Sequence, residues 1–256
     1  MLGFTLPNFK QENLGGLKIA AIYGIKPHLL GFCGPQERSA TQYLLRYLSG
    51  QKIAEKKIRE IFKGFEGAYS YYKLIARCNR IKDPFDERVV KSYWIGNNFL
   101  EKVPTKALKE MVVKEFSRSG LLPKKIAAKQ AKKIPVGSKP HHSFHVLRIG
   151  SITGRVKLRG KLLDLCRVGW GKVIAINLSQ SKIKVKFKPL KIGKKYRLGK
   201  IKEKYIIWNR NLLPQPKLGQ YISFHWNLAV QILTKKDLTN LQKYTQETLT
   251  VLNAIS

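Results

Sequence analysis

The sequence has few cysteines, and none of them belongs to a recognisable motif. Cys33, Cys78 and Cys166 lie far apart, so no CxxC spacing is present. The spacing gives no sign of a zinc ribbon or of a redox-active dithiol. An odd number of cysteines also argues against a framework of disulfide bonds. Any metal site must therefore combine cysteine and histidine side chains that only folding brings together.

Long apolar segments are absent as well. No stretch approaches the roughly 20 apolar residues that a membrane-spanning helix requires. Residues 1–7 lack the basic start and the long apolar core of a secretory signal. We therefore expect a cytoplasmic protein with no membrane partner.

The sequence patterns of several common enzyme classes are also missing. The chain contains no GxGxxG, Walker A, GxSxG or HExxH pattern. Dinucleotide binding, P-loop chemistry and the common hydrolase sites therefore have no support in the sequence.

Acidic residues are scarce, and basic residues are abundant. The chain has 15 Asp and Glu against 50 Lys and Arg, which gives a formal net charge of +35. Such an excess favours a polyanion or nucleic acid as partner, because binding would release counterions. The charge is spread over the whole chain, however, and most of it is lysine rather than arginine. A solvated lysine surface explains it equally well.

The first half of the chain has the pattern of short helices. Capping and breaking residues such as Ser39, Gly50 and Pro84 separate segments with apolar residues at helical spacing. The predicted helices are 40–48, 52–62, 66–79, 85–94, 104–117 and 124–133. Their close succession indicates a helical domain over residues 1–136.

The pattern changes after a hinge-like segment at residues 136–140. Short β-branched runs follow, punctuated by Gly, Ser and Pro, and Thr234 caps a last helix over 235–255. The predicted strands are 144–149, 154–157, 171–177, 182–188, 194–198, 205–207 and 221–230. We predict an α+β protein in which a small OB-like β-barrel and a C-terminal helix occupy residues 137–256.

Cys166 and His225 carry the most chemistry in the sequence. Cys166 lies at the mouth of a predicted strand, and His225 lies inside another. A thiol and an imidazole on regular structure suit iron or another transition metal. The positive charge of Arg167 is expected to favour the thiolate of its neighbour.

The residues around this pair follow an ordered pattern. Cys166 precedes Gly171-Lys172-Val173, a strand at 183–187 comes next, and the segment 218–229 around His225 leads to a terminal helix over 239–255. From about residue 164 onward this pattern resembles the HypC/HupF hydrogenase assembly chaperones. The resemblance implies that Cys166 and His225 hold an iron moiety of the Fe(CN)2CO type. It also implies a hydrogenase large subunit or maturation proteins as partners.

Two further segments extend the resemblance to the whole chain. They are residues 26–35, which read KPHLLGFCGP, and residues 140–147, which read PHHSFHVL. In these segments the chain resembles an uncharacterised prokaryotic family that carries such a domain at its C-terminus. This second resemblance implies a link to hydrogenase systems and supplies no activity.

His141, His142 and His145 form a second candidate metal cluster. Their separations would converge on one metal ion if the segment were helical, with Cys33 or Asp164 as a further ligand. Because Pro140 precedes the segment, we expect it to be extended instead. Cys33 itself lies in a glycine-rich turn, where a catalytic pairing with His28, His141 or His145 is conceivable.

The sequence thus favours an accessory protein over an enzyme. We predict a chaperone-like maturation factor that binds a client and an iron moiety through Cys166 and His225. The alternative is a basic β-barrel that binds RNA or DNA. A metal-dependent enzyme that uses the cluster of His141, His142 and His145 is the third and weakest hypothesis.

Overall fold

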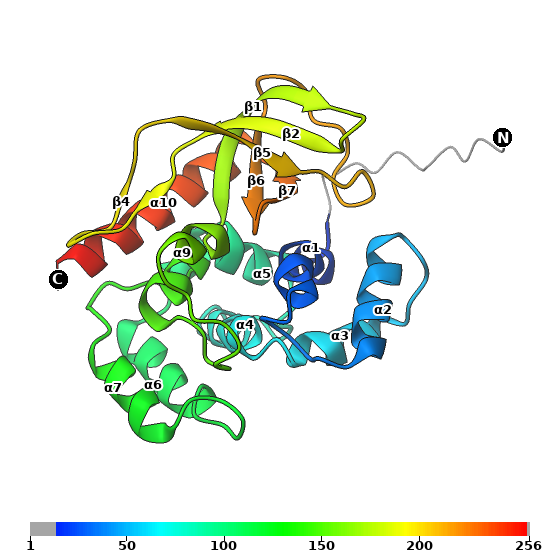
Figure 1. The fold of residues 1–256 in the computed structure, drawn as a ribbon. Helices are drawn as coiled ribbons and strands as arrows, with labels where there is room; N and C mark the ends of the chain where they lie inside the picture. The colour runs from blue at the N-terminus through cyan, green and yellow to red at the C-terminus, as the bar shows by residue number, and fades with distance from the viewer. Residues whose placement is uncertain (1–13, 255–256) are drawn as a thin grey trace.

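In the computed structural model, helices come first along the chain and strands follow (Figure 1). The structure describes residues 14–254. The helices are α1 (Gly16–Leu29), α2 (Arg38–Leu48), α3 (Glu55–Lys63), α4 (Glu66–Cys78), α5 (Glu87–Trp94), the 3-10 turn η2 (Asn98–Leu100), α6 (Thr105–Glu115), α7 (Lys124–Lys132), α8 (His142–Phe144), the π-turn η3 (His145–Ile149), α9 (Lys161–Cys166) and α10 (Lys235–Asn253). The six helices predicted in the first half are present.

Seven strands follow α9. They are β1 (Gly169–Asn177), β2 (Lys182–Phe187), β3 (Leu190–Lys191), β4 (Arg197–Leu198), β5 (Lys202–Ile207), β6 (Tyr221–His225) and β7 (Leu228–Ile232). Five of them form one sheet in the order β1-β2-β5-β7-β6, in which β1 also pairs with β6, while β3 and β4 form a small separate hairpin. A single parallel pair, Ile207 with Leu228, closes the ring between β5 and β7. The α+β class is confirmed, with a five-stranded sheet and a C-terminal helix in the second half of the chain; the ring of strands is irregular, because one residue pair joins β5 to β7.

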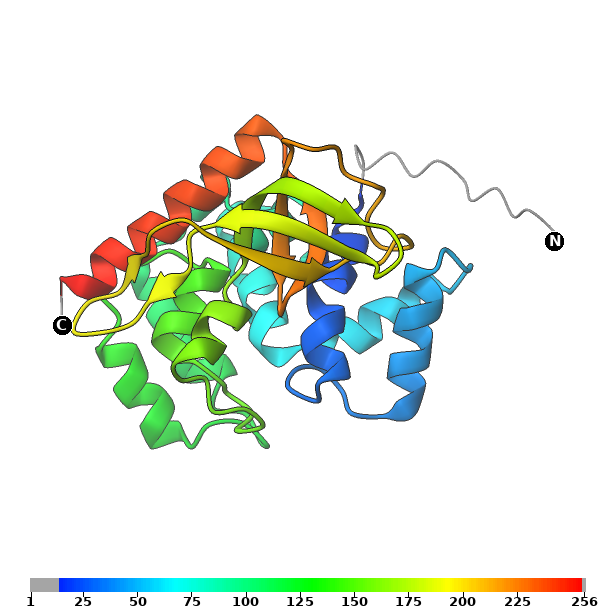
Figure 2. The same ribbon diagram turned by 45° about the horizontal axis from the view of Figure 1, so that its top comes forward.

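The sheet lies on one side of the molecule and most of the helices lie on the other (Figures 1 and 2). Helix α10 runs along the flank of the sheet. The Thr234 hydroxyl caps this helix by accepting the Asp237 N–H at 3.1 Å. The predicted last helix is confirmed as far as Asn253, and Ile255 lies outside the described residues.

Helix α1 was not predicted from the sequence, yet it lies at the centre of the molecule. Its residues from Ile19 to Ile25 are buried on every side. An all-round apolar helix has no amphipathic period, and the helix also contains Gly24 and Pro27, so the usual signals of a helix are missing. The Tyr23 hydroxyl bonds Ser223 of β6 at 2.8 Å, which ties this helix to the barrel.

Several predicted strands are wrong. Residues 144–149 form the end of α8 and the π-turn η3; Pro140 lies before the N-cap His141, where its missing N–H interrupts no helical hydrogen bond. Residues 154–157 form no strand, and 194–198 shortens to the two residues of β4. The segment 221–230 is a hairpin rather than one strand. Its turn residues Trp226 and Asn227 both have positive φ, the mark of a type I′ turn.

One cluster of buried side chains spans both predicted domains. Helical residues such as Tyr23 and Trp94 share it with Trp170 and Val230 of the barrel. The boundary between residues 136 and 137 stays a prediction, since the packing is continuous across it. Among residues 14–254, no helix combines the length and the apolar content that crossing a membrane requires.

Candidate metal centre

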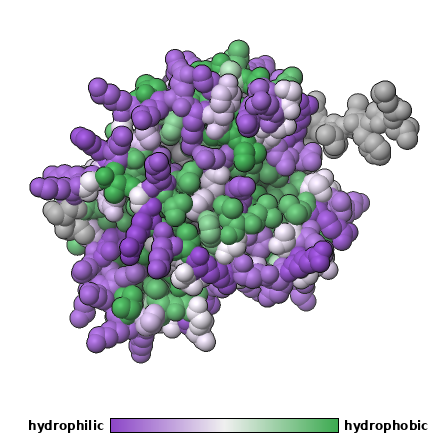
Figure 3. Space-filling model, in the orientation of Figure 1, coloured by the Kyte–Doolittle hydropathy of each residue, from purple (hydrophilic) through white to green (hydrophobic). Residues whose placement is uncertain are grey.

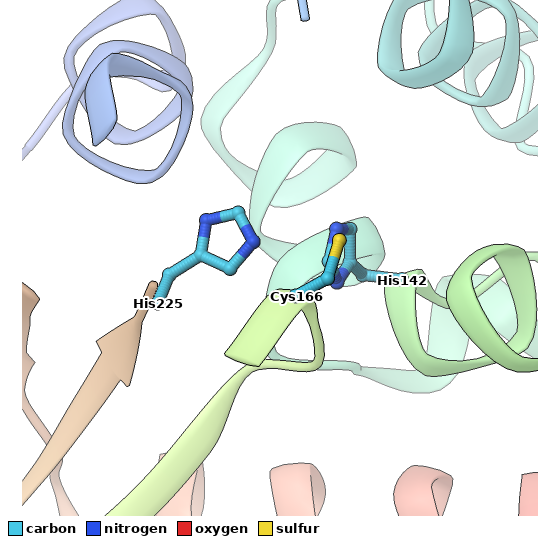
Figure 4. A group of neighbouring side chains, drawn as sticks. All are labelled: His142, Cys166 and His225. Atoms are coloured by element: carbon cyan, nitrogen blue, oxygen red, sulfur yellow. The ribbon is translucent and has the colours of Figure 1, made fainter. Parts of the chain in front are cut away.

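Three buried side chains from three segments converge at the junction of the helices and the barrel. His142 comes from α8, Cys166 ends α9, and His225 ends β6 (Figure 4). One potential ligand atom of each residue lies within 4.8 Å of those of the other two. Folding thus places Cys166 and His225 together, as the sequence pattern required, and adds His142 to the pair.

A backbone hydrogen bond places Cys166 beside His225. The Trp226 N–H in the β6–β7 turn donates to the Leu165 carbonyl at 2.8 Å. The end of α9 is therefore fixed to the hairpin that carries His225. Cys166 lies at the end of a helix and not at the mouth of a strand, which corrects the sequence-based placement. Strand β1 begins three residues later, at Gly169.

The ring of His225 is oriented by helix α1. Its Nδ1–H donates to the Tyr23 carbonyl at 2.7 Å. This bond fixes the tautomer and leaves Nε2 with a free lone pair, the arrangement that metal-binding histidines require. Nε2 is buried and forms no hydrogen bond of good geometry within residues 14–254, although the Cys166 carbonyl lies near enough to raise the pKa of the ring. The sequence carries no local signal of this support, because the uniformly apolar α1 has no amphipathic period.

His142 faces the same point because its segment is helical. The His141 side chain caps the short helix by accepting the Ser143 N–H at 3.3 Å. The His142 ring packs on Trp94 at 4.4 Å between ring centroids and stands perpendicular to the His225 ring at 5.0 Å. Its Nδ1 is also buried without a partner in the described part of the chain. The expectation of an extended segment was wrong.

The second candidate cluster is divided by the fold. His141 packs against Tyr244 of α10, with 6.1 Å between ring centroids. His145 turns toward the Tyr71 hydroxyl, 3.3 Å from its Nδ1. Only His142 joins Cys166 and His225, so the three histidines do not meet at one point.

Burial makes the apo site electrically neutral. It lowers the pKa of His142 well below its usual value and the pKa of His225 to about 4. It raises the pKa of the Cys166 thiol well above the ordinary range. Both imidazoles are thus ready to bind a metal ion, whereas the thiol must release its proton to do so.

Arg167 does not activate Cys166, which corrects a second expectation. Its guanidinium binds the carboxylate of Asp164 at 2.9 Å and stacks over the Trp170 ring. Asp164 also accepts the Leu190 N–H at 2.9 Å, so its carboxylate stabilises the local fold and does not belong to the cluster.

A different hydrogen-bond donor, the Trp226 indole, lies near the Cys166 sulfur. The Trp226 indole lies close enough to lower the thiol's pKa, yet its N–H has no acceptor in hydrogen-bond geometry.

A cavity of about 70 Å³ adjoins the cluster. His142, Cys166 and His225 line it together with Cys33 and mostly apolar side chains such as Phe65 and Ile152. The Cys33 thiol does not pair with His28, although the sequence allows that pairing. The two ring nitrogens of His28 bond the Cys33 carbonyl at 3.1 Å and the Thr41 hydroxyl at 2.9 Å.

The donor set of the cluster selects a class of metal ion. One sulfur and two imidazole nitrogens suit zinc, iron, cobalt or copper, and they do not suit magnesium or calcium, which prefer oxygen ligands. Bond lengths of about 2.1 Å to nitrogen and 2.3 Å to sulfur place tetrahedral donors roughly 3.5 Å apart. The 4.8 Å limit on the donor separations leaves a small contraction to reach this geometry.

Comparison with known proteins gives a family without an assigned activity. No curated protein matches the chain, and no solved structure matches it either. Residues 12–256 match one family model, described as a family of unknown function, DUF6390. Since the match covers nearly the whole chain, the protein belongs to this family.

Proposed function

We propose that this protein is a metal-binding accessory factor that holds a transition-metal ion between His142, Cys166 and His225. One observation carries the proposal: Nε2 of His225 and Nδ1 of His142 are buried without partners beside a buried thiol. Unpaired buried polar atoms are costly, typically about 1–3 kcal/mol each. A bound metal ion would satisfy both nitrogens at once.

Support for iron as the cargo comes from the sequence resemblance to the HypC/HupF chaperones. Under this proposal the cargo is an Fe(CN)2CO-type iron moiety, and the partners are a hydrogenase large subunit or maturation proteins. A thiolate is a strong donor to low-spin iron, and the imidazoles of His142 and His225 complete the set. The cytoplasm suits such a site, because its reducing conditions keep Cys166 as a free thiol.

The protein would act by binding and handing over rather than by turnover. The chain's own residues build the pocket: Tyr23 orients His225, Trp94 supports both imidazole rings, and mostly apolar side chains line the cavity beside them. Such support from surrounding groups typically changes metal affinity by about 10- to 100-fold. An accessory factor needs this control over metal affinity, and it needs no general base or nucleophile.

Anaerobic purification with metal analysis and infrared spectroscopy tests the proposal. We expect about one iron per chain and absorption bands of bound CO and cyanide. Both should be lost in Cys166→Ala and His225→Ala, and both should persist in Cys78→Ala, whose cysteine lies at the end of α4 outside the cluster. A wild-type protein that takes up no transition metal, even when reconstituted, would exclude the proposal.

A second candidate function rests on a different part of the molecule. A groove of about 740 Å³ between the barrel and α10 is lined by Trp170, Phe187 and Tyr221, with Lys186, Lys188 and Lys243 around them. Aromatic rings among cations are typical of surfaces that bind single-stranded nucleic acid, and Tyr221, which is 36% exposed, is the ring of these three on which a base could stack, since Trp170 and Phe187 are buried. Figure 3 shows hydrophilic side chains over much of one face of the molecule, with apolar patches between them.

Salt dependence distinguishes this candidate. Binding of a fluorescent single-stranded RNA should weaken steeply with added salt, because each phosphate contact releases counterions. The variant Lys186→Gln should weaken binding, whereas a lysine far from the groove, such as Lys125 of α7, should tolerate the same change. Affinity that stays constant between low and moderate salt would exclude nucleic acid as the ligand.

A further inference from the structure

The segment between η3 and α9 forms one wall of the cavity beside the donor cluster. Residues 150–160 contain neither helix nor strand and run as a loop into α9 (Figure 1). The cavity that the three donors line is also lined by Gly150, Ser151, Ile152, Thr153, Val156 and Leu158 of this segment. We infer that residues 150–160 form a lid that controls access to the cluster. The motion of the lid needs no metal, whereas its part in metal exchange rests on the proposed function.

The apolar side chains of the lid shield the donors from solvent. Ile152 is buried and belongs to the large apolar cluster that joins the helices to the barrel. Val156 and Leu158 pack in the smaller apolar cluster that contains Cys166. All three donors are buried beneath these contacts. A hydrated metal ion can reach them only when some part of the cavity wall moves away.

Hydrogen bonds hold the middle of the lid at a single point. Among the described residues, one hydrogen bond joins residues 151–158 to another part of the chain, and in it Arg155 Nη1 donates to the Gly34 carbonyl at 2.6 Å. The donors themselves lie on firmer elements. Cys166 ends a helix that is bonded to the β6–β7 turn, and His225 ends a strand with a partner on either side. Segments with few hydrogen bonds open first, so the lid is the wall expected to move.

A glycine with positive φ lies at each end of the lid. Gly150 has φ +77° and Gly160 has φ +52°, conformations that other residues adopt with strain. A Cβ added to either glycine would meet no atom within 4 Å beyond its chain neighbours, so backbone conformation rather than close packing calls for glycine there. Hinges are short positions that absorb a change of φ and ψ. Two such ends and one tie in the middle suit a segment that swings as a unit.

Alkylation of Cys166 in the reduced, metal-free, full-length protein tests the lid. Iodoacetamide is added to the native protein, and mass spectrometry of the peptides follows each cysteine separately. Arg155→Gln removes the tie, so we expect Cys166 to react roughly tenfold faster, the effect of losing a hydrogen bond from a charged group. Arg159→Gln is the matched control, because it removes the same charge from the same segment. The exposed Arg159 side chain forms no hydrogen bond in the described part of the chain, so this variant should react like the wild type.

The urea dependence of the rate separates a lid motion from unfolding of the whole protein. A local opening exposes little surface, so low concentrations of urea should leave the rate at Cys166 nearly unchanged in the wild type and in Arg155→Gln. A rate that rises steeply with urea would mean that Cys166 reacts only in the unfolded chain. Either that result or a wild-type rate in Arg155→Gln would overturn the inference.

Cobalt(II) distinguishes the lid from the metal site. If the wild type binds no cobalt, the proposed function fails, and the alkylation rates still decide the lid. If cobalt binds, it should enter Arg155→Gln and leave it to a chelator roughly tenfold faster than in Arg159→Gln. The Kd should stay the same, because a lid changes both rates and none of the ligands. Faster release without faster entry would make Arg155 a support of the metal site and would count against the lid.

Discussion

The buried cluster consists of a rare kind of residue, whereas the lysine-rich barrel face, the surface around Lys184 and Lys186 of β2, consists of an abundant kind. Histidine is rare, with 5 residues, yet four of the five are buried, and the fifth, His145, lines the cavity. Basic side chains are abundant, and on the barrel face they pair loosely with the few acids, as Lys184 does with Glu203 at 2.8 Å. A rare residue that folding gathers in the interior says more about function than an abundant one spread over the surface.

The two regions also differ in how they respond to change. The cluster is neutral and buried, so losing one ring or gaining one charge there is expensive. The barrel face is solvated, and its ion pairs contribute little. This contrast orders the expected effects of the experiments below.

Trp94→Ala should have the largest effect on stability. The Trp94 ring is 4% exposed, stacks on Tyr23 at 4.9 Å between centroids and supports His142 and His225. Its N–H also donates to the Tyr72 hydroxyl at 2.7 Å. We expect a loss of about 3–5 kcal/mol in the free energy of unfolding, measured by urea denaturation. Ile201→Ala at a site 63% exposed should stay within about 0.5 kcal/mol. Equal losses of unfolding free energy in Trp94→Ala and Ile201→Ala would contradict the expected difference between the buried cluster and the exposed surface.

Acid should destabilise the metal-free protein through histidines whose rings the fold keeps neutral. Burial lowers the pKa of His141 to about 3 and that of His145 to about 4, whereas unfolding restores a value near 6.5. The unfolded chain then binds more protons, so stability is complete above about pH 6.5 and is lost as the pH falls toward 4. Between pH 7 and pH 5 the loss is roughly 2 kcal/mol for each of the two histidines.

Urea unfolding at the two pH values, with chelator present, measures this loss. His145→Gln should reduce the loss of unfolding free energy between pH 7 and pH 5 by roughly 2 kcal/mol, the contribution of one histidine. A stability that does not change between pH 7 and pH 5 would mean that these histidines are already solvated.

Trp226→Phe should weaken metal binding with little change in fold. The indole N–H is buried beside the Cys166 sulfur and lacks an acceptor, so a metal-bound thiolate would provide one. Its loss should reduce cobalt affinity about tenfold, near 1.4 kcal/mol. Trp170→Phe is the matched control, because that indole lies under Arg167 and outside the cavity. If both variants bind cobalt like the wild type, the indole does not support the thiolate.

The sequence predicted the two kinds of region with unequal success. The amphipathic helix α2 and the alternating strand β2 were predicted, because their patterns repeat with the period of the structure. The pairing of Cys166 with His225 could be inferred from the residues that frame them. That the two side chains lie close together is shown here, and that they bind metal stays a prediction.

The third residue of the cluster shows the limit of prediction from the sequence. His142 belongs to a candidate metal cluster in the sequence, but Pro140 before it predicts an extended segment. The structure instead begins a short helix there, capped by His141 and continued as a π-turn. The hydrogen bond from His225 to Tyr23 and the turn that carries Cys33 depend on α1, whose uniform apolar sequence has no period to detect. Contacts between segments more than a hundred residues apart leave no local signal.

The smallest effect on stability is expected on the barrel face. A substitution there can test ligand binding without changing the fold. Lys186 is half exposed and lies 3.8 Å from Glu203, a separation too long for a strong ion pair. Lys186→Gln should therefore change the free energy of unfolding by no more than about 0.5 kcal/mol. If the groove binds RNA, the same substitution should lower the slope of log affinity against log salt by nearly one unit, one phosphate contact's share. A change in slope without a change in stability would assign this face to a ligand, and no change in either would leave its lysines as solvated surface.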